Sequence, residues 1–165
     1  MELRRIQNTD IKHVMRLYFS CFEGERPQER GDANDVRHYL LKMIEGNIGL
    51  GAFDEEKLVG MAFLDQNYKA SDFTIESLCV DRAYRGKGYA SWIIETACVI
   101  ADDNDCSVEM LIDKNAVAAL AHYKQMGFEI SDVDSGEYTA LFRPSKEQRA
   151  FKVKPPENGP LPAVA

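Results

Sequence analysis

The segment 75–90 constrains the fold most strongly, because an apolar strand pattern runs directly into a glycine-containing turn that opens a helix. Gly86 and Gly88 lack a Cβ, so the backbone there can adopt unusual angles and approach a ligand closely. The first amides of the following helix have no acceptor within it, and together with the helix dipole they favour an anion such as pyrophosphate. Arg85 and Lys87 add positive charge. The segment therefore predicts a strand–turn–helix unit suited to a phosphate-bearing ligand.

Two well-known phosphate-binding motifs are absent from this turn. A P-loop needs GxxxxGK followed by Ser or Thr, and no such pair follows these glycines. A dinucleotide fingerprint needs GxGxxG soon after the first strand, whereas Ser91 stands three positions after Gly88 in the middle of the chain. A lone GxG also fits an ordinary strand-to-helix turn, and that interpretation stays open on these residues.

Strand and helix patterns alternate on both sides of the turn. Strands are predicted at residues 3–6, 48–53, 58–64, 73–80, 107–112, 128–133 and 138–142. Helices are predicted from Thr9 or Asp10 to Phe22, from Asn34 or Asp35 to Gly46, and at residues 88–101 and 116–126. The order β-αα-βββ-α-β-α-ββ indicates an α/β or α+β sandwich around one core. A length of 165 residues suits a single domain.

Composition excludes several classes of protein. An apolar fraction of 45% with 28% charged residues is typical of a globular chain and argues against wholesale disorder. No apolar run is long enough to span a membrane. Residues 1–5 alternate in charge and lead into no apolar run, which is not the pattern of a secretory signal.

The charge is unevenly distributed. The net charge is −7, yet residues 143–165 are net basic, so residues 1–142 carry the acidic excess. An acidic body argues against binding to nucleic acid and is compatible with a cationic substrate. The prolines at 155, 156, 160 and 162 favour an extended tail, and we divide the chain into a domain at 1–143 and a basic, proline-rich tail at 144–165. The tail could also pack on a partner subunit.

The cysteines predict no metal site. Cys21, Cys79, Cys98 and Cys106 form no CxxC pair and have no nearby histidine at zinc-ligand spacing. The first three lie in apolar segments and are interpreted as small buried hydrophobic residues. This usage favours a reducing, cytoplasmic compartment.

Two motifs carry a resemblance to a known family. Arg85-x-x-Gly88-x-Ala90, after an apolar strand, resembles motif A of the GNAT superfamily, the acetyl-CoA-dependent N-acetyltransferases, with the pattern Gln/Arg-x-x-Gly-x-Gly/Ala. Asn115-x-x-Ala118-x-x-x-His122-Tyr123-x-x-x-Gly127-Phe128 resembles motif B, in which a helix bearing a tyrosine ends at Gly-Phe. One helix and one strand separate the motifs, as in that family. The resemblance implies a single domain with a mixed, mostly antiparallel sheet whose parallel strands, here 73–80 and 107–112, splay apart between flanking helices.

The resemblance also implies a cofactor site without a metal. Acetyl-CoA, as co-substrate, would lie between the splayed strands, with its pantetheine arm against the backbone of Leu78, Cys79 and Val80. The pyrophosphate would lie on the amides of the turn and helix start, beside the charged side chains already named. The residues concerned are Arg85, Gly86, Lys87, Gly88, Tyr89 and Ala90. Asn115 matches a position that often touches the cofactor.

The implied reaction is direct acetyl transfer to a primary amine of a small molecule or a protein. By resemblance, Glu76 would be the base that removes a proton from the amine, and Tyr123 the acid that protonates the leaving thiolate. Each also has a structural interpretation: Glu76 as a half-exposed polar residue on its strand, and Tyr123 as a core residue in line with Ala119 and Leu120.

The acceptor pocket of such proteins lies between the first two helices, their loop and the last two strands. Carboxylates at those places, which would suit an amine, are Glu23, Glu25, Glu29, Asp32, Asp132, Asp134 and Glu137. They could equally be solvated loop charges. Many members dimerise, so a homodimer is an open alternative to a monomer. The rival function is a non-catalytic module in which acyl-CoA binding regulates a protein interaction.

Overall fold

The computed structural model describes residues 1–22, 31–67 and 69–153, and the fold follows the predicted order with one added helix. The strands are β1 Glu2–Arg5, β2 Ile48–Asp54, β3 Lys57–Asn67, β4 Asp72–Val80, β5 Ser107–Asp113, β6 Glu129–Ser135 and β7 Tyr138–Arg143. The helices are α1 Ile11–Phe22, α2 Ala33–Gly46, α3 Tyr89–Asp103, α4 Val117–Gln125 and α5 Lys146–Val153. Short 3-10 turns precede α1 at Asn8–Asp10 and follow β4 at Arg82–Tyr84.

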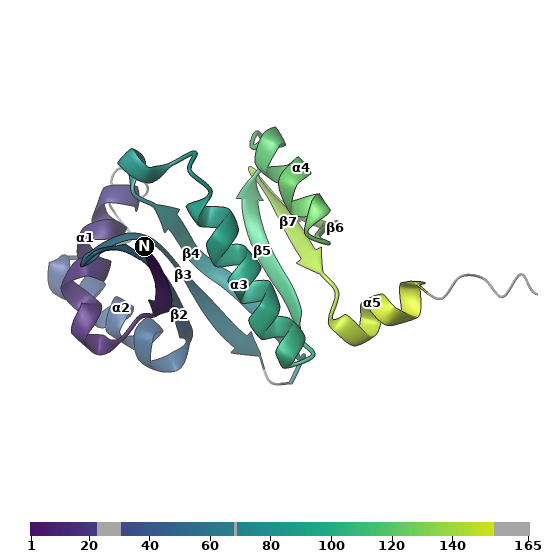
Figure 1. The fold of residues 1–165 in the computed structure, drawn as a ribbon, viewed down its shortest axis with the longest axis horizontal. Coiled ribbons are helices and arrows are strands. Elements are labelled where there is room, and N and C mark those ends of the chain that lie inside the picture. Colours follow the sequence, from purple (N-terminus) through teal and green to yellow (C-terminus); the bar gives the residue numbers. More distant parts are fainter. Residues whose placement is uncertain (23–30, 68, 154–165) are drawn as a thin grey trace, which may run out of the picture.

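All seven strands form one mixed sheet in the order β1-β2-β3-β4-β5-β7-β6 (Figure 1). Every neighbouring pair is antiparallel except β4 and β5, which run parallel. The parallel pair needs a crossover, and α3 supplies it. The predicted α/β fold class, with a mostly antiparallel sheet and one parallel pair, is confirmed.

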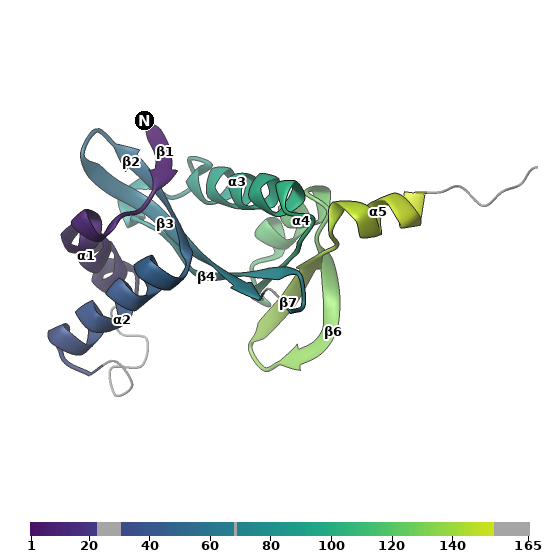
Figure 2. The same ribbon diagram turned by 90° about the horizontal axis from the view of Figure 1, so that it is seen from below.

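Helices cover both faces of the sheet. Strands β2 and β3 are therefore buried on both sides along most of their length. Helix α3 packs Ile93 and Ile94 on one face, in a cluster that also holds Tyr123 of α4. Helices α1 and α2 cover the other face through Val14, Leu17 and other apolar residues at helical spacing. Figure 2 shows α3 on one side of the sheet and α1 and α2 on the other.

Two predicted helix starts are wrong by a few residues. Asp32, rather than Asn34 or Asp35, caps α2, because its carboxylate accepts the N–H groups of Asn34 at 2.8 Å and of Asp35 at 3.0 Å. Asp10 does not cap the first helix either. Its carboxylate accepts the N–H of Gln7 at 2.8 Å, so it completes a capping box that Gln7 begins.

Helix α5 lies in the segment assigned to the tail and was not predicted. A second capping box forms it: Gln148 N–H donates to Ser145 Oγ at 3.2 Å, and Ser145 N–H donates to Gln148 Oε1 at 2.9 Å. The four prolines that argued against a helix all lie beyond it, at positions 155–162, outside the described residues.

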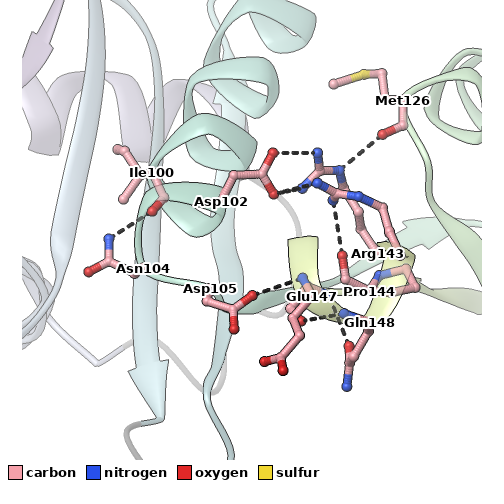
Figure 3. Close-up of polar contacts among 11 residues, drawn as sticks. Ile100, Asp102, Asn104, Asp105, Met126, Arg143, Pro144, Glu147 and Gln148 are labelled. Atoms are coloured by element: carbon pink, nitrogen blue, oxygen red, sulfur yellow. Dashed lines mark hydrogen bonds and ion pairs between the residues drawn. The ribbon is translucent and has the colours of Figure 1, made fainter. Parts of the chain in front are cut away.

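One carboxylate joins α5 to the body of the protein. Asp102 of α3 accepts both terminal nitrogens of Arg143, at 2.9 and 3.0 Å, and one from Arg149 of α5, at 2.7 Å (Figure 3). Arg143 also donates through Nε to the carbonyl of Met126 at 3.0 Å. These charge-assisted bonds connect the end of α3, the end of α4, β7 and α5.

Candidate functional site

Strands β4 and β5 pair only at their beginnings. Asp72, Phe73 and Thr74 lie opposite residues 107–109, and beyond Thr74 the two strands no longer pair. Figure 1 shows them diverging toward their carboxyl ends, while β5 continues to pair with β7 as far as Asp113. The second half of β4 therefore presents backbone N–H and C=O groups along an unpaired edge. Such an edge can bind an extended ligand as an added strand would.

A β-bulge in β4 lies just beyond the point where its pairing with β5 ends. Met61 and Phe63 of β3 lie opposite Cys79 and Glu76, so β4 carries one extra residue between these pairs. Ser77 within this stretch has a φ of 52°, which lies in the left-handed region that non-glycine residues rarely adopt. Residues 78–80, which follow the bulge, line a cavity together with the start of α3.

The turn after β4 has the predicted geometry. Gly86 and Gly88 have φ values of 73° and 88°, and a Cβ at either position would meet no atom within 4 Å. Gly88 is the N-cap of α3, and its carbonyl accepts the first helical hydrogen bond, from Trp92, at 3.0 Å. The amides of residues 89–91 therefore have no acceptor within the helix, and the positive end of its dipole faces the turn.

Side-chain contacts hold the turn against the sheet. The Asp81 carboxylate accepts the N–H of Ala83 at 3.0 Å and pairs with Lys57 at 3.1 Å. Tyr84 donates its hydroxyl to Asp54 at 2.9 Å, and this contact raises the pKa of the phenol. Arg85 Nε donates to the carbonyl of Val80 at 3.0 Å. Contacts of Asp81, Tyr84 and Arg85 thus hold the turn in place without a ligand.

Two cavities beside the bulge share part of their lining. The first, of about 500 Å³ and here called the turn cavity, lies between Cys21 and Phe22 of α1, residues 78–80 of β4, residues 84–86 and residues 88–91. The second, of about 1040 Å³ and here called the sheet cavity, is lined by residues of β4, β5, β6 and β7 with Phe22 and Tyr39. Phe22 and Leu78 line both cavities. A ligand along β4 could therefore present its end to a second molecule in the sheet cavity.

Most predicted cofactor-binding residues line the turn cavity. These are Leu78, Cys79, Val80, Arg85, Gly86, Gly88, Tyr89 and Ala90. Lys87 is exposed between the two glycines, with its ammonium group 5.0 Å from the centre of the Tyr84 ring. Asn115 lies apart: it is exposed before α4 and lines neither cavity.

Glu76 lines the sheet cavity. It lies opposite Phe63, which packs in the cluster under α1 and α2, so both side chains belong to that face of the sheet. Burial raises the pKa of the Glu76 carboxyl, and the charge of Asp65 raises it further. A carboxylate of this kind is a stronger base than an exposed one.

Tyr123 is placed differently from Glu76. It is buried in α4, packs edge-to-face on Phe128 with ring centres 6.3 Å apart, and lines neither cavity. Burial raises the pKa of its phenol, which keeps the hydroxyl protonated at neutral pH. The structure thus places Glu76 at the sheet cavity and Tyr123 in the hydrophobic core.

Of the carboxylates predicted for the acceptor pocket, the structure describes the side chains of Asp32 and Glu137, and neither of these two lines the sheet cavity. Asp32 caps α2, and Glu137 is exposed in the β6–β7 turn. Among the described residues, those that bring a carboxylate to the cavity are Glu76, Glu109 and Asp113. Glu23, Glu25 and Glu29, and the side chains of Asp132 and Asp134, lie outside what the structure describes.

Sequence reasoning missed several residues of the site. Cys21 was expected to be buried, yet it is half-exposed and lines the turn cavity. Glu109 and Asp113 alternate along β5, a period-two signal that could have placed both on one face. Nothing in the sequence marks Ser77 as a bulge, because serine is not typical of positive φ.

The comparisons with known proteins agree with this geometry. The model of the acetyltransferase (GNAT) family matches residues 11–128, which is more than half of the chain. The chain belongs to the GNAT acetyltransferase family. No curated protein sequence matches this GNAT protein. Solved structures do: PaiA N-acetyltransferase of Thermoplasma acidophilum, in complex with coenzyme A, has a TM-score of 0.70 at 16% identity, covering 87% of this chain and 98% of that one.

Two further structures have the same fold as this GNAT protein. A chimera of spermidine N-acetyltransferase SpeG of Vibrio cholerae and hSSAT has a TM-score of 0.70 at 16% identity, over 93% of this chain and 98% of that one. The ribosomal-protein-S18-alanine N-acetyltransferase of Escherichia coli has a TM-score of 0.65 at 13% identity, over 86% and 90%. Identities this low establish the fold and leave the acceptor open.

The described residues contain neither a membrane-spanning helix nor a cluster of metal ligands. No helix among them has the length and apolar character needed to cross a bilayer. Within the same residues, His, Cys, Asp and Glu form no group of three or more that could hold a metal ion.

Proposed function

We propose that this protein transfers the acetyl group of acetyl-CoA directly to a primary amine. The observation that carries the proposal is the unpaired edge of β4, which leads past the bulge into the Gly86–Gly88 turn and the free amides of α3. An extended arm that ends in a pyrophosphate matches this sequence of groups. Family membership and the neighbour solved with coenzyme A support the same cofactor.

In this proposal the two ends of the turn cavity hold different parts of acetyl-CoA. The backbone of Leu78, Cys79 and Val80 would bind the pantetheine arm, and the amides of residues 86–90 the pyrophosphate, with charge from Arg85 and Lys87. Asn115 lines neither cavity, so it would contact only a part of the cofactor that extends beyond the turn cavity. The bound thioester supplies the acyl group, and the protein supplies position and proton transfer.

Glu76 is the proposed base. A protonated alkyl amine is no nucleophile, so a base must accept a proton from it, directly or through a water. Glu76 lines the sheet cavity, which shares Leu78 with the turn cavity, and the raised pKa of its carboxyl suits proton acceptance. Tyr123 is the proposed acid for the leaving thiolate, on the family motif and on its protonated phenol.

The lining of the sheet cavity favours a cationic acceptor. Carboxylate-bearing residues Glu76, Glu109 and Asp113 occur there with the aromatic residues Tyr39 and Tyr138, and both groups attract ammonium ions. Neighbours named for spermidine and for a ribosomal protein's alanine indicate that this fold serves small-molecule and protein amines alike. We propose no nucleic-acid or membrane partner, place the protein in the cytoplasm on its free cysteines, and leave monomer and homodimer as alternatives.

An acceptor screen tests the proposal. Acetyl-CoA is mixed with the protein and with polyamines, amino sugars or lysine peptides, and release of free CoA thiol is followed. We expect turnover with at least one cationic amine and its loss in Glu76→Gln. Acetyl-CoA binding without turnover on every class of amine would contradict the enzyme assignment and favour the non-catalytic module.

A further inference from the structure

Two thiols lie together at the wall of the turn cavity. Cys21, at the carboxyl end of α1, is half-exposed, and Cys79 of β4 is buried. The Sγ of Cys21 donates to the carbonyl of Val80 at 3.5 Å, so it lies against the unpaired part of β4. The cavity thus holds a nucleophilic side chain that the acetyl-transfer proposal does not use.

The surroundings make Cys21 the reactive thiol of the pair. The Cys79 thiol donates to the Cys21 sulfur, and the Arg85 guanidinium adds a positive charge, so the pKa of Cys21 falls to about 7 although burial and Asp81 oppose the shift. The same contact, together with burial, raises the pKa of Cys79 and keeps it protonated. At neutral pH, Cys21 therefore exchanges between a thiol that donates to Val80 and a thiolate that accepts from Cys79.

The other two cysteines provide the contrast. Cys98 and Cys106 are buried away from the turn cavity, and burial raises the pKa of Cys98 to about 11 and raises that of Cys106 as well. A thiol exchanges with a disulfide fastest when its pKa is close to the ambient pH. Among the four cysteines, only Cys21 combines such a pKa with exposure to a cavity.

We propose that Cys21 is a thiol–disulfide exchange site for disulfides of coenzyme A. The inference rests on the proposed function, because the cofactor's pantetheine arm would run along residues 78–80 in the cavity that Cys21 lines. A CoA disulfide would enter as the cofactor does, on the Gly86–Gly88 turn. The mixed disulfide would fill the cavity and exclude acetyl-CoA until a thiol reductant removed it.

The exchange balances without any other reagent. The Cys21 thiolate attacks one sulfur of the CoA disulfide, a bond forms between that sulfur and Sγ, and the original S–S bond breaks. The second coenzyme A leaves as a thiolate and takes up a proton from water, which replaces the proton that Cys21 lost. The protein gains the mass of one coenzyme A less two hydrogen atoms.

Intact-mass spectrometry tests the proposal on the full, reduced chain. The chain is incubated at neutral pH with CoA disulfide, with or without excess acetyl-CoA, and the adduct is located by peptide mapping. Oxidised glutathione, a disulfide without a nucleotide, is run in parallel. We expect one adduct, at Cys21, that acetyl-CoA blocks, that a reductant removes, and that glutathione disulfide forms more slowly.

Variants separate reactivity from folding. Cys21→Ser should lose the adduct while still binding acetyl-CoA in a calorimetric titration. Cys79→Ala should slow the labelling roughly threefold to fivefold, because it removes the thiol donor and so raises the pKa of Cys21. Cys106→Ser is the matched control and should label like wild type, since serine can keep the 3.4 Å bond from Cys106 Sγ to the carbonyl of Asn104.

Two results would overturn the inference in different ways. Wild-type protein that binds acetyl-CoA but forms no adduct would remove the exchange site and leave the proposed function intact. An adduct at Cys21 that forms equally fast with glutathione disulfide, that acetyl-CoA does not block and that occurs without measurable acetyl-CoA binding would contradict the cofactor site itself.

Discussion

Glu76 and Tyr123 differ in their surroundings, and that difference decides what each residue can do. Glu76 is half-exposed at a cavity, where a change of protonation reaches a bound amine directly. Tyr123 is buried against Phe128, so its hydroxyl can donate a proton only to a group that reaches into the core. Each role can be tested by removing a single functional group.

Glu76→Gln should lower kcat by roughly 10²–10⁴-fold, the contribution typical of a general base. In wild type, activity should fall as the pH drops through the pKa of Glu76, which burial places above the usual value of a glutamate, and the variant should lack this acid limb. Steady-state kinetics against pH measure both effects. Glu109→Gln, in the same cavity, is the control and should raise KM for the amine while keeping the limb. A limb unchanged in Glu76→Gln would reassign the base.

Tyr123→Phe should keep the fold, because the ring that packs on Phe128 remains, and should lower kcat by removing the proton donor. Tyr138→Phe, exposed at the sheet cavity, removes a hydroxyl elsewhere and should leave the chemical step unchanged. Single-turnover rates and thermal unfolding distinguish the two variants. Full activity in Tyr123→Phe would show that another group protonates the thiolate.

At the scale of elements, the bulge in β4 lies within the unpaired edge. Ser77→Val should cost about 1–2 kcal/mol of unfolding free energy, because a β-branched residue resists a φ of 52°, and should weaken acetyl-CoA binding. Glu55→Val is the control, since Glu55 has a φ of 54° in the β2–β3 turn and should lose stability without losing affinity. Denaturant titration and calorimetry measure the two quantities. If both variants bind acetyl-CoA with equal affinity, the bulge does not contribute to the acetyl-CoA site.

An element can be predicted from the sequence when the pattern that indicates it extends over only a few neighbouring residues. The strands and the Gly86–Gly88 turn could be predicted because periodicity and glycine act over a few residues. Helix α5 could have been predicted from the Ser145-x-x-Gln148 capping box, but the prolines beyond it dominated the interpretation. The bulge and the sheet cavity could not, because β-strands distant in the sequence create them only after the sheet has formed.

At the scale of the whole molecule, Asp102 connects four elements through two arginines. Asp102→Asn should lower the unfolding free energy by about 2–3 kcal/mol, since it leaves the buried Arg143 without its charged partner. The arginines hold the pKa of Asp102 below its usual value, so this stabilisation is present above that usual pKa and is lost as the pH falls through the lowered one. The gap between wild type and variant should therefore close in acid.

Denaturant unfolding at several pH values measures that gap. Asp103→Asn, at the exposed neighbouring position, is the control and should change stability little at any pH. A variant Asp102→Asn as stable as wild type at neutral pH would mean that the cluster contributes no net stability and that α5 is held by other contacts.

The measurement that tests the central claim most directly is a calorimetric titration of acetyl-CoA into wild type, Gly88→Glu and Gly136→Glu. Both glycines have positive φ with open space where a side chain would stand, so the two variants carry the same backbone strain. Only Gly88→Glu places a negative charge where the pyrophosphate would lie. We predict that wild type and Gly136→Glu bind acetyl-CoA and that Gly88→Glu does not. A folded wild type that fails to bind, or a Gly88→Glu variant that binds equally well, would contradict the assignment of the turn cavity as the acetyl-CoA site.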